Sequence, residues 1–202
     1  MGSKAKEGVE SIRYSPRGST FKKTLYDTGY MGEGKYSSYN SPLAHESWRG
    51  IFRRVYCLKS LFKYPTYIGC SVHEDWHNFQ NFAKWFEENY VKGWKIDKDI
   101  LIKGNKIYSP DTCCFVPHEI NMKFIVPPLN KHGLPRGIQP INGKYLVEVR
   151  SIDQKRIYSR FLTIGESQKF WQSHRVNIIR ELAEKFKNEL NIKVYNKLIS
   201  IT

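Results

Sequence analysis

Acidic residues are scarce in this sequence: 19 Asp and Glu side chains face 33 Lys and Arg side chains, and the formal net charge is +14. A surplus of this size favours a polyanionic partner, and nucleic acid is the most common one. Long apolar runs are also lacking, so no segment is long enough to span a bilayer, and the first residues lack the apolar core of a signal peptide. We therefore expect a cytoplasmic protein with a nucleic-acid partner and no membrane partner.

Cysteine is the next scarce residue, with four in 202 positions. They are Cys57, Cys70, Cys113 and Cys114, and the last two are adjacent, which suits a disulfide between them badly. Without a secretory signal, reduced thiols are expected. The spacing Cys70-x2-His73-x3-His77 supports two interpretations. One is a structural zinc site built from Cys57, Cys70, His73 and Cys113, and the other, more common, is buried thiols beside surface histidines.

The sequence contains enough apolar residues to form a hydrophobic core. Hydrophobic residues make up 40% and aromatic residues 14% of the chain, enough for one compact domain or two small ones. The pattern of elements predicts an α+β fold in four parts. These are an irregular basic N-terminal arm (1–40), helices followed by two strands and a helix (41–126), a Pro-rich linker (127–135), and a three-stranded sheet with helices (136–202). The arm either follows a phosphate backbone or docks on the protein through its tyrosines.

Two amphipathic helices are predicted before the first strands. In residues 45–59 the apolar positions recur at helical spacing, and three arginines fall mostly off that stripe: Arg49, Arg53 and Arg54. In residues 74–90 an aromatic stripe runs from Trp76 to Phe86 in the same way. We expect both stripes to be core. The arginines form either a phosphate-contacting face or a solvated one, and a solvated face is more common.

The next stretch predicts a strand over 96–101, a turn at Gly104-Asn105, a second strand from Ile107, and a short helix that opens after Pro117. Asp97 leaves the first strand, and Asn121 is on the helix. A carboxylate oxygen and an amide oxygen that meet at one point are hard ligands of the kind magnesium prefers.

This stretch resembles the ββα-metal core of HNH nucleases, in the divergent form found in phage homing-endonuclease-like proteins. Asp97 matches the acidic metal ligand, Ser109-Pro110-Asp111-Thr112-Cys113 matches the middle segment with Thr112 where Asn is usual, and Asn121 matches the helix ligand. Lys98 stands where the general-base His belongs, and His118 is the nearest histidine in sequence. The resemblance implies that Asp97, Lys98 and Asn121 occupy catalytic positions, with Mg²⁺ or Mn²⁺ held by Asp97 and Asn121. His118 is a candidate base only by its closeness in sequence, the alternative being an ordinary residue of the first helical turn, and Lys98 is an alternative phosphate contact. An ammonium cannot accept a proton from water at neutral pH, so two readings stay open: a DNA nickase, and an inactive derivative.

The last unit predicts three strands, over 136–139, 144–150 and 155–162, then a helix over 163–186 and a terminal helix within 188–202. The Asn142-Gly143 dipeptide predicts the turn into the second strand. Alternation along this strand puts Tyr145, Val147 and Val149 on the core face.

This unit resembles the Apetala-two/ethylene-response-factor type of DNA-binding domain, through Arg136-Gly137-Ile138, Gly143-Lys144-Tyr145, Glu148-Val149-Arg150 and residues 155–161. The resemblance implies that the sheet enters the major groove of double-stranded DNA. Together with lysines near the metal stretch, the expected DNA-binding residues are Lys98, Lys103, Lys106, Arg136, Lys144, Arg150, Lys155, Arg156 and Arg160. Three alternatives remain: a regulator or inhibitor that binds a protein partner, an RNA-binding adaptor, and a basic sheet that is merely solvated.

Overall fold

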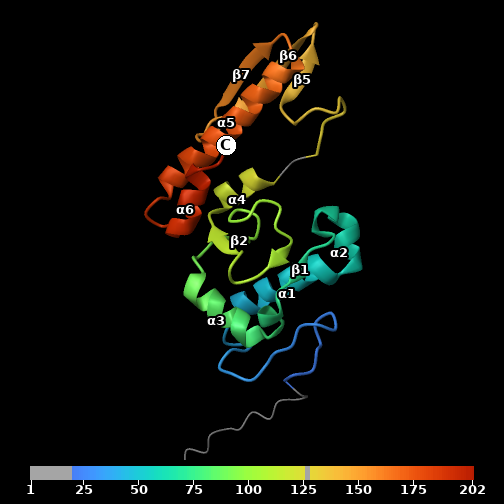
Figure 1. The fold of residues 1–202 in the computed structure, drawn as a ribbon, viewed down its shortest axis with the longest axis vertical. Coiled ribbons are helices and arrows are strands. Elements are labelled where there is room, and N and C mark those ends of the chain that lie inside the picture. The colour runs from blue at the N-terminus through green and yellow to red at the C-terminus, as the bar shows by residue number, and fades with distance from the viewer. Residues whose placement is uncertain (1–19, 126–127) are drawn as a thin grey trace, which may run out of the picture.

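The computed structural model describes residues 20–125 and 128–202. The expectations for residues 1–19, for Val126 and for Pro127, the first residue of the predicted linker, therefore lie outside the described residues. The fold is α+β, as predicted. The molecule is elongated, with a three-stranded sheet at one end and helices α1 and α3 toward the other (Figure 1). Among the described residues, no helix combines the length and the apolar character needed to cross a membrane.

The first core lies between helix α1 (Pro42–Tyr56) and helix α3 (Phe79–Asn89). Both predicted stripes are buried, and the indole N–H of Trp48 donates to the Trp76 carbonyl at 2.7 Å. Trp76 belongs to a short 3₁₀ helix, η2 (Glu74–His77). At Cys57 the backbone is extended, which ends α1 and separates it from helix α2 (Leu58–Lys63); a second 3₁₀ turn, η1 (Pro65–Tyr67), follows.

The described part of the N-terminal arm lies against α3. The amide of Gln80 donates to the carbonyls of Met31 and Tyr36 at 3.0 and 2.9 Å, and a β-bridge joins Tyr30 to Asn78. The Tyr36 hydroxyl donates to the Glu87 carboxylate. These contacts favour the docked arrangement for residues 20–40 over an arm that is free to follow a phosphate backbone.

The strands in the middle of the chain pair differently from the prediction. Strand β2 (Lys95–Asp97) pairs antiparallel with β4 (Cys114–Val116), whereas β3 (Ile107–Tyr108) pairs in parallel with β1 (Ser71–Val72). The expected hairpin at Gly104-Asn105 is therefore wrong, and the strand expected over 96–101 ends at Asp97. The reason is local: the Asp97 carboxylate accepts the backbone N–H groups of Asp99 and Ile100, which bends the chain out of the strand. Helix α4 (His118–Phe124) opens after Pro117, as predicted.

The C-terminal sheet has the order β5-β6-β7 and is antiparallel throughout. Strand β6 (Lys144–Arg150) has the predicted bounds, β7 (Arg156–Phe161) is one residue shorter at each end, and β5 (Ile138–Ile141) begins two residues later than expected. Asn142 and Gly143 both have positive φ, 50° and 72°, and they form the predicted turn. Val147 and Val149 are buried, which confirms the predicted core face.

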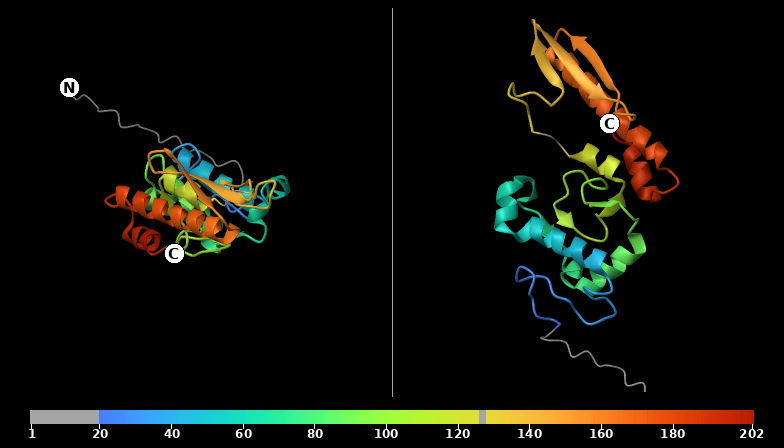
Figure 2. Two further views of the ribbon diagram at one scale, coloured as in Figure 1. Left: turned by 90° about the horizontal axis from the view of Figure 1, so that it is seen from above. Right: turned by 180° about the vertical axis from the view of Figure 1, so that it is seen from behind.

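Helix α5 (Ile164–Lys185) serves two cores. Its beginning is fixed by a capping box between Thr163 and Glu166. Its first half covers the sheet with Phe170 and Trp171. Its second half enters another core with α4, strand β4 and helix α6 (Ile192–Ile199), and the buried members from α5 are Ile178, Ile179, Leu182 and Ala183. The view from behind shows the same path along the sheet and down to α4 and α6 (Figure 2). The sequence divides the chain near residue 127, but this second core uses side chains from both sides of that division.

Candidate nucleic-acid interface

The outer face of the C-terminal sheet follows from its register. Leu146 lies opposite Arg160, Glu148 opposite Tyr158, and Arg150 opposite Arg156. Neighbouring positions on β6 alternate between faces, and Val147 and Val149 are buried against α5, so these three pairs point away from the helix. Four cations of this face are exposed: Lys144, Arg150, Arg156 and Arg160.

One acidic side chain interrupts this basic face. The Glu148 carboxylate lies 3.4 Å from the Arg156 guanidinium, and both side chains remain in contact with solvent. An exposed ion pair of this kind contributes at most about 1 kcal/mol, so Arg156 can exchange Glu148 for a stronger anion at little cost. The face therefore combines exposed cations with Tyr158 and Leu146, which offer apolar contact.

The two remaining predicted cations of this unit lie beside the sheet. Lys155 is exposed in the tight turn between β6 and β7, which Ser151 closes by accepting the Lys155 N–H at 3.2 Å through its hydroxyl. Arg136 is exposed just before β5, and its carbonyl accepts the Trp171 indole N–H at 2.9 Å. Helix α5 thus fixes the backbone at Arg136, and the side chain is left to solvent.

Asp97 and Lys98 take part in the folding of a loop. The Asp97 carboxylate oxygen lies 2.7 and 2.9 Å from the N–H groups of Asp99 and Ile100, and burial raises the pKa of this carboxyl. The Lys98 side chain is only 8% exposed, and its ammonium donates to the Asp99 carboxylate at 2.6 Å and the Asn105 carbonyl at 2.7 Å. The sequence suggested Lys98 as the residue at the general-base position and as a DNA contact. In the structure its side chain is instead enclosed by its own loop.

His118 and Asn121 border a different surface. They line a cleft of about 640 Å³ between α1, β2 and α4, together with Arg53, Arg54 and Ile96. Asp97 does not line this cleft. Ile96 alternates with Asp97 along β2, so the two side chains point to opposite faces of the strand. No hydrogen bond or ion pair joins Asp97 to Asn121 within residues 20–125 and 128–202, and the structure does not bring the predicted metal pair together.

The four predicted zinc ligands are not gathered either. In the part of the chain that the structure describes, no three His, Cys, Asp or Glu side chains are placed to hold one ion. Cys70 and Cys113 are buried in the first core, and burial raises the pKa of Cys113 to about 12, which keeps the thiol protonated. His73 accepts the Asp75 N–H through its ring, at the start of η2. Cys70 and Cys113 are buried and His73 is exposed, as the alternative predicts, whereas Cys57 and His77 are half-buried.

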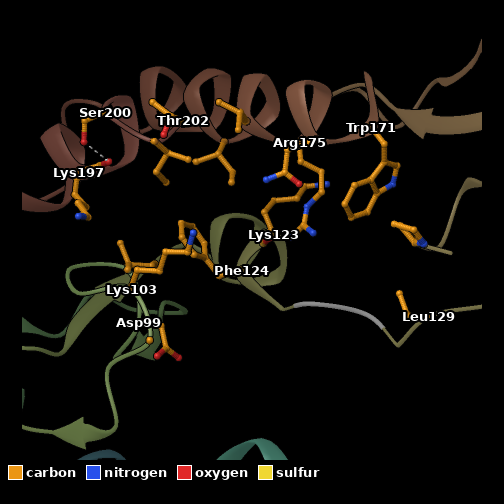
Figure 3. A pocket seen from close by; sticks show the side chains of 17 residues that line it. Asp99, Lys103, Lys123, Phe124, Leu129, Trp171, Arg175, Lys197, Ser200 and Thr202 are labelled. Carbon is orange, nitrogen blue, oxygen red and sulfur yellow. Dashed lines mark hydrogen bonds between the residues drawn. The ribbon is translucent and has the colours of Figure 1, made fainter. Parts of the chain in front are cut away.

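Lys103 and Lys106 lie apart from the sheet face. The Lys106 ammonium donates to the carbonyls of Thr66 and Ile68, at 3.1 and 3.4 Å. Lys103 lines a cavity of about 700 Å³ between the 99–104 loop, α4 and α5. Figure 3 shows Lys103 and Phe124 across this cavity from Trp171 and Arg175. Both lysines are exposed, but neither belongs to the basic face of the sheet.

Comparison of the chain with protein-family models, with curated proteins and with solved structures gives no match.

Sequence reasoning left one basic surface undecided, because Arg49, Arg53 and Arg54 were expected to form either a phosphate-contacting face or a solvated one. Arg53 and Arg54 both line a cleft shared with α4 and a cleft shared with α2, and Lys59 and Lys63 join them in the second. The signal was present in the sequence as arginines lying off the apolar stripe of α1, but a solvated face has the same pattern. Only the break at Cys57, which turns α2 back beside the end of α1, brings these four cations together.

Proposed function

We propose that this protein binds double-stranded DNA through the outer face of the sheet β5-β6-β7. The observation that carries the proposal is the set of exposed cations on one face of a three-stranded sheet whose other face is packed on α5. A sheet of this width can enter the major groove, where arginines reach phosphates and guanine edges. The formal net charge of +14 and the resemblance to ethylene-response-factor domains agree with this function.

We further propose that the chain is a DNA-binding relative of phage HNH homing endonucleases that acts as a cytoplasmic regulator or inhibitor, and not as a nuclease. The residues present do not fit a single magnesium or manganese ion, because one Asp97 oxygen already accepts two backbone N–H groups and Asn121 lines a cleft that Asp97 does not line. Lys98, where a base is needed, is an ion-paired ammonium. Binding without hydrolysis is therefore the function that the geometry supports best.

Replacing sheet arginines tests the binding proposal. We expect Arg150→Ala/Arg156→Ala to weaken duplex binding by about tenfold or more and to lower the slope of log K against log salt by about 2, because each phosphate contact contributes about 0.9 to that slope. Fluorescence anisotropy over a salt series measures both quantities. The matched control is Lys84→Ala/Lys193→Ala, which removes the same charge from exposed positions on α3 and α6.

A plasmid-nicking assay with Mg²⁺ or Mn²⁺ tests the proposal that the protein is not a nuclease. Unaltered protein is expected to leave supercoiled plasmid intact while it retains salt-sensitive binding. Nicking by the unaltered protein that Asp97→Ala abolishes would contradict the non-nuclease proposal. Binding to RNA without binding to duplex DNA would contradict both parts.

A further inference from the structure

The junction of α1 and α2 forms a cleft lined by cations without an acidic neighbour. The cleft has a volume of about 500 Å³, and its basic lining residues are Arg53, Arg54, Lys59 and Lys63. The other lining residues are Cys57, Ser60, Tyr64 and Tyr67, none of which carries a negative charge when protonated. Four cations around one concave surface give a local positive field that attracts phosphate.

Across the described part of the chain, these four cations have no anionic partner. None of the four forms an ion pair or a side-chain hydrogen bond among residues 20–125 and 128–202. The Arg54 Nε atom is buried and has no hydrogen-bond partner, although the guanidinium lies over the Tyr108 ring at 5.7 Å. A buried charged donor without an acceptor is costly. Arg54 lines the α2 cleft and is half-buried, so a phosphate in the cleft would give this cation an anionic partner.

Arg53 and Arg54 also line the cleft on the other side of α1, where Lys95, His118 and Asn121 add further donors. The two arginines therefore form a ridge between two concave surfaces, and basic or polar side chains continue on both sides of it. Such a series of donors suits a polyanionic strand better than a single small anion. Glu46 borders the α4 cleft but not the α2 cleft, so the α2 side is the more positive of the two.

We propose that this ridge and its α2 cleft form a second DNA-contact site that binds the phosphodiester backbone. The inference rests on the proposed function, because the partner is the duplex held by the sheet. In the fold, α1 and α2 lie in the half of the molecule away from the sheet (Figure 1). Sheet and ridge then contact different segments of one duplex, and the ridge adds affinity without reading sequence.

Replacing ridge cations in the full chain tests the inference on a duplex of about 30 base pairs, roughly three helical turns. We expect Arg53→Ala/Lys59→Ala to weaken binding about tenfold and to reduce the salt slope by about 2, relative to the charge-matched Lys84→Ala/Lys193→Ala. All four side chains are exposed, so the fold should tolerate both variants. An affinity and slope equal to those of the control would overturn the inference.

Protection of Cys57 gives a second readout that does not depend on affinity. Cys57 lines the α2 cleft and is partly exposed, whereas the other three cysteines are buried, and the Ser60 N–H lowers the pKa of the Cys57 thiol. Saturating duplex should slow alkylation of Cys57 by N-ethylmaleimide at least fivefold, as followed by mass spectrometry. Unchanged alkylation under saturation would overturn the inference, as would equal protection by millimolar inorganic phosphate, because the cleft would then take a free anion.

The two proposals fail in different ways. If the sheet variant Arg150→Ala/Arg156→Ala loses binding and the ridge variant does not, the second site is wrong and the proposed function stands. If the ridge variant loses binding and the sheet variant does not, the sheet proposal is wrong and the ridge is the DNA-contact site.

Discussion

At the scale of single residues, the 97–107 loop shows how polar side chains that look catalytic can be structural. Asp97 holds two backbone N–H groups, Lys98 donates to Asn105, and the Asn105 amide donates back to the Lys98 carbonyl at 2.8 Å. Each of these contacts satisfies a backbone group that the irregular loop would otherwise leave unpaired. The residue types of a metal site and of a well-closed loop are the same here, so the sequence alone could not separate them.

The structural role of Asp97 in this loop predicts the stability of Asp97 variants. Burial raises the pKa of Asp97, so its contribution to stability is complete below about pH 3.9 and is lost as pH rises through the folded-state pKa. At pH 7 we expect Asp97→Asn to be as stable as the unaltered protein or more so, because the amide oxygen can still accept both N–H groups. Asp97→Ala should lose about 1–3 kcal/mol, since both donors lose their acceptor.

Urea unfolding between pH 4 and pH 8 measures this difference. The stability of Asp97→Asn relative to the unaltered protein should rise with pH over the lower part of that range and then level off. A constant deficit of Asp97→Asn at every pH would mean that the carboxylate charge itself stabilises the loop.

At the scale of elements, the local signals were reliable and the non-local pairings were not. The Asn142-Gly143 turn and the alternation of β6 are encoded within a few residues, and the structure confirms both. Strand β3 is only two residues long and pairs with β1, more than thirty positions earlier. Nothing in the pattern around Ile107 and Tyr108 distinguishes that partner from β2. The sequence therefore predicts the C-terminal sheet well and the strands around Asp97 poorly.

Gly137, just before β5, and Gly143, in the turn between β5 and β6, test how closely β5 packs on β6. Gly137 has φ +98°, and a Cβ there would lie 2.5 Å from the Glu148 carbonyl oxygen, whereas a Cβ on Gly143, with φ +72°, would meet open space. Gly143→Ala should cost about 1–2 kcal/mol from its backbone conformation. Gly137→Ala should cost clearly more, because β5 must also move away from β6. Thermal unfolding compares the two, and equal costs would show that β5 shifts freely.

At the scale of the whole molecule, α5 joins the sheet to the second core. Phe170 and Trp171 pack on the sheet, and Ile179 and Leu182 pack with α4 and α6. Because α5 is one continuous helix whose start is fixed by a capping box, we expect its two halves to unfold cooperatively. The sequence predicted this helix almost to the residue, but its double role depends on which partners meet each half. That information is spread over residues 100–198 and is not local.

We therefore expect the sheet and the second core to unfold together. Leu182→Ala should destabilise the protein by about 2–5 kcal/mol, and backbone amides of β6 should lose protection against hydrogen exchange along with those of α4. Leu162→Ala is the matched control, because Leu162 is 70% exposed and its removal should change stability by at most about 0.5 kcal/mol. Unchanged exchange of the β6 amides in Leu182→Ala would show that the two parts unfold separately.

The position of α5 also limits how this chain can evolve by recombination. A recombination event at the Pro-rich segment would carry away the sheet together with Ile178, Leu182 and Val194, and would leave Ile120 and Val116 without the side chains that cover them. Only donors with a compatible packing surface would give a viable hybrid, so the three-stranded sheet is inherited together with the core that supports it.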